Sequence, residues 1–135
     1  MTEIKIGGRA VPLNYTAFEI IEIQKEMGCT AFQLKEEVFG LRKVEDENDP
    51  NAEPQIFFDV VKDAEKIEKL GKLITILGNS GLEASGQEPD LTAKWVLRNM
   101  RPALILPYAI ATMAEINEGN MMEVKPDEKG PVDEI

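Results

Sequence analysis

The residues with the greatest chemical potential in this chain are one cysteine and scattered carboxylates, because the sequence contains no histidine. Without histidine, the usual general base, the commonest zinc ligand and the partner of a Cys-His or Ser-His pair are all missing. Cys29 precedes a predicted helix start, where the helix dipole can stabilise a thiolate. Its nearest charged neighbour in the sequence is Glu26 rather than a cation. This context favours a buried, unreactive thiol.

Three polar segments are candidates for ligand sites, and none has the required pattern. Residues 45–54 contain five carboxylates but lack the alternating ligands, central glycine and closing glutamate of a calcium loop. Residues 78–81 lack the lysine and the preceding strand of a phosphate loop. Glu83, Glu88 and Asp90 have the chemistry of paired carboxylates, but a charged loop explains them equally well. We therefore expect no enzyme activity, no cofactor and no metal.

Composition sets the class of protein. A chain of 135 residues with 43% hydrophobic residues has enough apolar material for one domain with a core. The net charge of −10, with no run among its 15 basic residues, argues against nucleic-acid binding. No segment has the length and hydropathy of a signal peptide or a membrane-spanning helix. We therefore expect a cytoplasmic protein that does not bind membranes.

The N-terminal segment predicts a β-hairpin over residues 3–14, because two short apolar stretches flank a Gly-Gly turn. Two helices are predicted next, over residues 17–27 and 31–39. Each starts with a capping box, a threonine followed three residues later by Glu or Gln, and each ends at a glycine. The apolar residues of the first helix cover more than one side, which predicts packing on two sides. In the second helix we expect Phe32, Leu34, Val38 and Phe39 to be buried.

An acidic loop is predicted over residues 43–55, because this segment is polar and contains two prolines. Apolar residues spaced by three and four then predict an amphipathic helix from residue 56 to about 77. The segment 78–81 is expected to break it, since it contains two glycines.

The longest apolar run, residues 103–113, places the centre of the core in residues 90–113. We expect a helix over residues 91–100 with Asp90 as its N-cap, and a second helix over 102–118. Pro107 should kink or restart the second helix, and Gly119 should end it. The acidic residues 121–135 predict a disordered tail.

The expected fold is mainly α: one compact domain of about five helices over residues 1–120, with a small N-terminal hairpin. Aromatic and methionine residues gather near its C-terminal end. Most are expected to be core, but flexible methionines also suit an adaptable contact surface. The candidate partner-binding residues are Trp95, Tyr108, Met113, Met121 and Met122.

Several strings of residues resemble, in the same order, the tail assembly chaperones of long-tailed bacteriophages and prophages of Gram-positive bacteria. The resemblance covers residues 6–120. It rests on Ile6-Gly7-Gly8-Arg9, Pro12-Leu13-Asn14-Tyr15-Thr16, Gly28-Cys29-Thr30-Ala31-Phe32-Gln33-Leu34, Ile76-Leu77-Gly78-Asn79, Gly86-Gln87-Glu88-Pro89-Asp90-Leu91-Thr92, Trp95-Val96-Leu97-Arg98-Asn99-Met100 and Ile116-Asn117-Glu118-Gly119-Asn120.

This resemblance implies a non-enzymatic helical protein that binds the tape measure protein, keeps it soluble and helps to recruit tail tube subunits. It also implies self-association, and absence from the mature virion. In many members a programmed frameshift adds a second domain that contacts the tail tube protein, so this chain is expected to be the shorter product.

The alternative is an acidic inhibitor, or anion mimic, without a chaperone role. A mimic is expected to display its carboxylates on ordered helices. Here the densest acidic runs fall in the predicted loop and in the tail, which disfavours that alternative.

Overall fold

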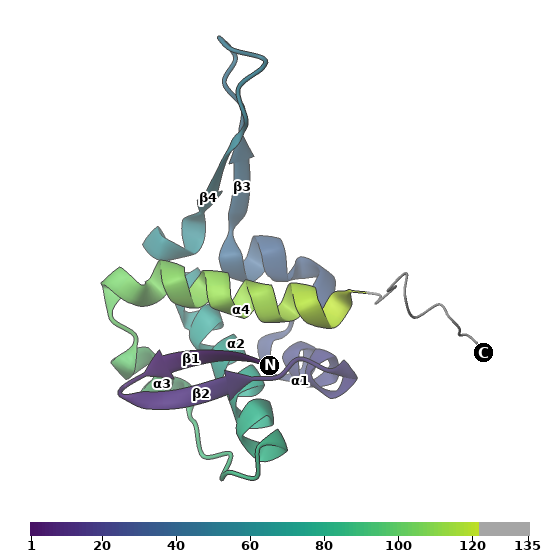
Figure 1. The fold of residues 1–135 in the computed structure, drawn as a ribbon, viewed down its shortest axis with the longest axis vertical. Helices are drawn as coiled ribbons and strands as arrows, with labels where there is room; N and C mark the ends of the chain where they lie inside the picture. The colour runs from purple at the N-terminus through teal and green to yellow at the C-terminus, as the bar shows by residue number, and fades with distance from the viewer. Residues whose placement is uncertain (122–135) are drawn as a thin grey trace, which may run out of the picture.

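Helix α2, Ala64–Ala84, forms the centre of the structure, which is a computed structural model describing residues 1–121 (Figure 1). The N-terminal hairpin and the helices α1, α3 and α4 all contact it. Its fully buried residues are Leu70, Leu73, Ile74, Leu77 and Leu82. The predicted fold class, mainly α with a small N-terminal hairpin, is confirmed. The expectation that residues 90–113 form the centre of the core is wrong, because α2 occupies that position.

The predicted break of this helix at residues 78–81 is also wrong. Strand β2 lies so close to α2 that a side-chain carbon added at Gly81 would lie 1.8 Å from the carbonyl oxygen of Pro12. At Gly78 the same atom would lie 2.9 Å from a methyl group of Val11. The helix continues through both glycines, and their missing side chains leave room for strand β2 to pack against it. Asn79 lies between these glycines and fixes the loop that follows α2. Its side-chain oxygen accepts from the N–H of Leu91 at 2.9 Å, and its side-chain nitrogen donates to the carbonyl of Leu91 at 3.1 Å.

Strands β1, Thr2–Ile6, and β2, Arg9–Leu13, form the predicted antiparallel hairpin. Gly7 and Gly8 make its turn with positive φ angles of 58° and 78°, which glycine adopts without strain. The inward-facing apolar residues of both strands are buried against α2 and α4. Burial against helices stabilises a hairpin that would be marginal alone.

Helix α1, Ala17–Met27, has the predicted boundaries and the predicted capping box. The N–H of Thr16 donates to the buried carboxylate of Glu19 at 2.8 Å, and Gly28 ends the helix in a left-handed conformation. The predicted packing on two sides is wrong. Phe18 and Ile21 are 63% and 56% exposed, so only one side faces the core.

The next predicted helix, over residues 31–39, is divided into a 3₁₀-helix η1, Ala31–Gln33, and a π-helix η2, Lys35–Phe39. Gly40 ends the second with a φ of 58°, as expected. Leu34, Val38 and Phe39 are buried as predicted. The prediction for Phe32 is wrong: it is 97% exposed, because it lies in η1 and points away from the body.

A second β-hairpin, which we call the arm, contains most of the predicted acidic loop as its tip, and strands that the sequence did not predict flank that tip. Strand β3, Leu41–Val44, pairs with β4, Gln55–Phe58, and residues 45–54 form its tip. The predicted helix start at residue 56 is therefore wrong, because residues 56–58 belong to β4 and α2 begins at Ala64. After β4 comes a 3₁₀-helix η3, Asp59–Lys62, and the side chain of Asp63 then caps α2.

Helix α3, Ala93–Asn99, is capped by Thr92, whose hydroxyl accepts from Trp95 N at 3.1 Å. Asp90 is thus not the N-cap; it forms an ion pair with Arg9 at 2.9 Å. A 3₁₀-helix η4, Pro102–Leu104, then leads into α4, Ile105–Asn120.

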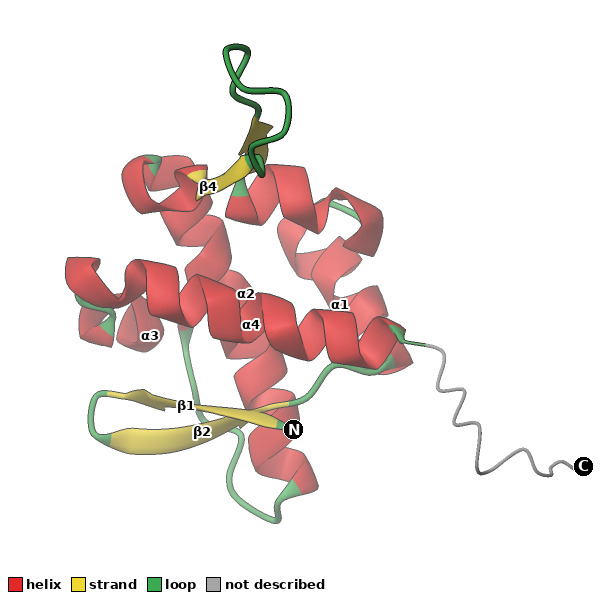
Figure 2. Ribbon diagram, turned by 45° about the horizontal axis from the view of Figure 1, so that its top comes forward, coloured by secondary structure: helices red, strands yellow, loops and turns green. Residues whose placement is uncertain are grey.

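Helix α4 crosses α2 in Figures 1 and 2 and contacts both α2 and β1. Pro107 is the third residue of α4. The first N–H groups of a helix have no partner within the helix, so a proline there costs no hydrogen bond. The helix therefore restarts just before Pro107, as predicted. The helix continues past Gly119 to Asn120, and Gly119 instead allows a close approach by Tyr15. Of the predicted tail, only Met121 lies within the described residues.

Candidate partner-binding surface

The structure distributes the predicted partner-binding residues over different environments. Trp95 and Met113 are half-buried and pack against the core. Tyr108 is buried, and its hydroxyl donates to the carbonyl of Lys5, so this side chain is a core residue rather than a surface contact. Met121 is 70% exposed, whereas Met122 lies outside the described residues. These positions belong to different parts of the body and do not form one surface.

Cys29 is buried, and this burial raises the pKa of its thiol. A raised pKa leaves less thiolate at a given pH, and only the thiolate reacts readily. No group of three or more His, Cys, Asp or Glu residues in positions 1–121 is placed to hold a metal ion.

We expect the thiol of Cys29 to react with a thiol-specific reagent at least tenfold more slowly in the folded protein than in denaturant at the same pH. The measurement is the labelling rate at neutral pH, with the unfolded chain as its own control. Equal rates in the two states would show an accessible, reactive thiol.

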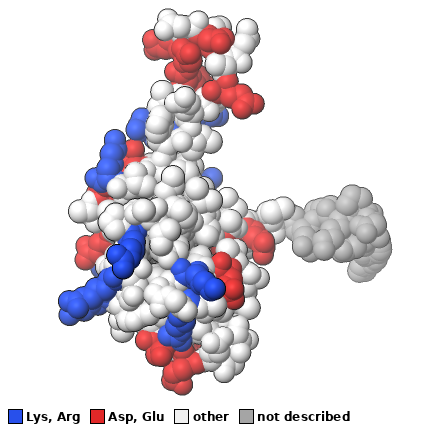
Figure 3. All heavy atoms as spheres, turned by 60° about the vertical axis from the view of Figure 1, so that its left-hand side comes forward, with Lys and Arg blue, Asp and Glu red and all other residues white. Residues whose placement is uncertain are grey.

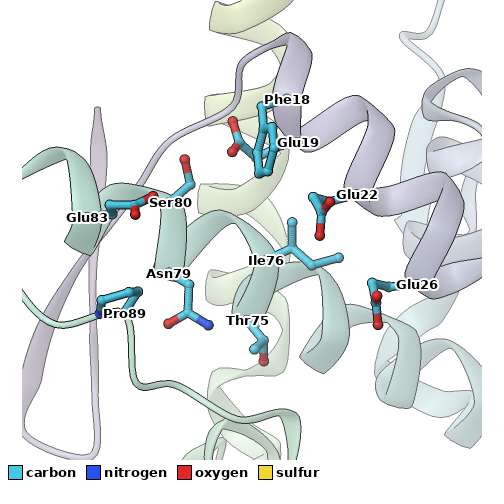
Figure 4. A pocket seen from close by; sticks show the side chains of 10 residues that line it. All are labelled: Phe18, Glu19, Glu22, Glu26, Thr75, Ile76, Asn79, Ser80, Glu83 and Pro89. Carbon is cyan, nitrogen blue, oxygen red and sulfur yellow. The ribbon is translucent and has the colours of Figure 1, made fainter.

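A concave surface lies between α1 and α2, and we call it the α1–α2 groove (Figure 4). It encloses about 270 Å³. Its apolar lining comes from Phe18 on α1, Ile76 on α2 and Pro89 in the following loop, while its remaining residues are polar or acidic. The full set is Phe18, Glu19, Glu22, Glu26, Thr75, Ile76, Asn79, Ser80, Glu83 and Pro89.

A second hollow of about 290 Å³ extends the groove along α2. It shares Glu26, Thr75 and Ile76 with the first and adds Lys72 and Ala93. The shared residues make the two hollows continuous. From residue 72 to residue 83, α2 rises by about 16 Å at 1.5 Å per residue, or three turns. The groove is therefore long enough for about three turns of a partner helix.

The charge of the groove is strongly negative. Glu22, Glu26 and Glu83 line it, and none of them forms an ion pair with another residue of the described chain. Glu19 is committed to the cap of α1. Figure 4 shows the side chains of both helices around the space between them. A groove lined by apolar side chains and free carboxylates suits an amphipathic segment that carries Lys or Arg beside its apolar side chains.

Sequence reasoning did not identify this groove. Its residues come from α1 and α2, which are about 50 residues apart in the chain, so only the fold brings them together. One signal was present, namely Glu19, Glu22 and Glu26 spaced by three and four along a helix. That spacing places the three carboxylates on one face.

Residues 1–121 contain no helix with the length and hydropathy needed to cross a membrane. Comparison of the chain with known protein families, with curated proteins and with solved structures finds no match.

Proposed function

We propose that this protein is a tail assembly chaperone of a long-tailed phage or prophage, and that the α1–α2 groove binds helical segments of the tape measure protein. The sequence resemblance over residues 6–120 supports the function. The observation that supports the site is the groove itself, which is three turns long and is lined by apolar side chains and free carboxylates. Binding there would cover apolar faces of a long helical chain, which would otherwise aggregate.

The acidic charge of the chaperone has a second effect in this proposal. Each bound copy adds negative charge to the complex, which keeps coated tape measure chains apart in solution. The protein would act in the host cytoplasm before the tail is complete and would be absent from the mature virion. Recruitment of tail tube subunits would follow, either by this chain or by a longer frameshifted form.

Co-expression with the tape measure protein encoded beside this chain tests the proposal. The wild-type chain should keep the tape measure protein soluble and co-purify with it. The double variant Glu22→Lys, Glu26→Lys should bind the tape measure protein about tenfold more weakly, corresponding to about 1.4 kcal/mol of lost binding free energy, and should leave less of it soluble.

The matched control is Glu68→Lys, Glu118→Lys, which makes the same change in net charge at two exposed helical positions outside the groove. It should behave as the wild type. Loss of binding in this control would mean that net charge alone matters and would contradict the groove as the site. No soluble complex with the wild-type chain would contradict the chaperone function itself.

A further inference from the structure

The arm carries apolar surface that the described chain leaves partly exposed, although the Arg42 guanidinium lies over the ring of Phe57 at 5.0 Å from its centroid. Val44, Ile56 and Phe57 are 40%, 59% and 41% exposed, although they belong to a two-stranded ribbon. Figure 1 shows this ribbon projecting away from the helices. A two-stranded ribbon is marginally stable alone, and open strand edges with apolar side chains favour pairing or packing with another chain.

Hydrogen bonds join the two strands at the base of the arm. Arg42 on β3 forms two hydrogen bonds to Asp59, at 3.1 and 3.2 Å, and Asp59 N donates to the Gly40 carbonyl at 3.0 Å. The hydrogen bond from Arg42 also lowers the pKa of the Asp59 carboxyl. The pair therefore persists until the pH falls below the usual range of an aspartate. This pairing closes the base of the arm, and Figure 1 shows the arm directed away from its own body rather than folded onto it.

The tip of the arm and one face of the body have opposite charge. Residues 45–54 contain five carboxylates and no basic residue. Residues 91–114 contain three basic residues and no carboxylate, although the whole chain is strongly acidic. Figure 3 shows the acidic side chains at the end of the arm and several basic side chains on the body below it.

The basic segment also carries exposed apolar side chains. Leu106 and Ile110 lie one turn apart on the side of α4 that faces away from the core, and they are 40% and 48% exposed. Leu104, 40% exposed, precedes them. We define the α3–α4 face by the exposed residues of this segment, namely Lys94, Arg98, Arg101, Leu104, Leu106 and Ile110.

We propose that the arm of one copy of this protein docks on the α3–α4 face of a second copy. The apolar ribbon covers Leu106 and Ile110, and the acidic tip lies against the basic side chains of α3. The two surfaces differ, so the contact joins copies head to tail and leaves a free arm and a free face at the ends. Such a contact forms a ring or an open filament rather than a symmetric dimer. This inference concerns the chain alone and does not depend on the tape measure protein.

Two variants each remove one half of this contact. Ile56→Asp places a charge on the apolar ribbon, and Leu106→Asp places one on the α3–α4 face; both positions are exposed, so both variants should fold. We expect the purified wild-type chain to form species larger than a monomer, with a mass that increases with concentration. Each variant should associate at least tenfold more weakly. The measurement is light scattering after size-exclusion chromatography, with thermal melts to confirm folding.

Mixing the two variants gives the sharpest result. The Leu106→Asp copy retains a normal arm and the Ile56→Asp copy retains a normal face, so the mixture should form a one-to-one dimer. Ile21→Asp on α1 is the matched control, since Ile21 is exposed to 56% but lies outside both surfaces, and it should assemble as the wild type. A monomeric wild type, continued assembly of the single variants, or a mixture that stays monomeric would each overturn the proposal.

Discussion

Replacing Gly81 with alanine is expected to lower the free energy of unfolding by about 2 to 3 kcal/mol, the upper range for overpacking a core. The added carbon would lie 1.8 Å from the Pro12 carbonyl oxygen and 2.4 Å from its carbon. Both are backbone atoms, so strand β2 must move away from α2. Alanine favours a helix over glycine by about 1 kcal/mol, but this gain is too small to offset the displacement. The thermal midpoint should fall by roughly 10 °C.

Gly71→Ala in the same helix is the matched control for this prediction. The three atoms nearest its added carbon all belong to the side chain of Leu97, which is half-buried and has other rotamers available. We expect a loss of at most about 1 kcal/mol there. Chemical denaturation of both variants measures the difference. A Gly81→Ala protein as stable as the wild type would show that the hairpin does not lie against the helix in this way.

The sequence predicted best those features that depend on neighbouring residues. The cap of α1 needs only Thr16 and Glu19, three residues apart, and the hairpin turn needs only two adjacent glycines. The helix boundary at Gly28 likewise depends on one local conformation. These elements form where predicted because their hydrogen bonds are satisfied within a few residues.

Features that depend on distant contacts were predicted less well. Gly78 and Gly81 have low helix propensity, and nothing near them in the sequence indicates that a strand will pack on them. The arm was missed because Ile56 fits the period of the following helix and the acidic residues at the tip conceal two short strands. The candidate partner-binding residues were chosen by type, as aromatic and methionine residues, whereas Tyr108 is part of the core and the groove contains four glutamates among its ten lining residues.

The location of the core gives the last prediction, which compares two leucines. Leu73 on α2 is fully buried, whereas Leu106, within the longest apolar run of the sequence, is 40% exposed. Leu73→Ala should cost about 3 to 4 kcal/mol, because it removes buried contacts and leaves a cavity. Leu106→Ala should cost less than about 1 kcal/mol, because the residue still contacts water in the folded state. Urea denaturation at a concentration where the chain is monomeric measures both, so that assembly does not contribute to the stability. Equal losses, or a greater loss at Leu106, would place the centre of the core in α4 instead of α2.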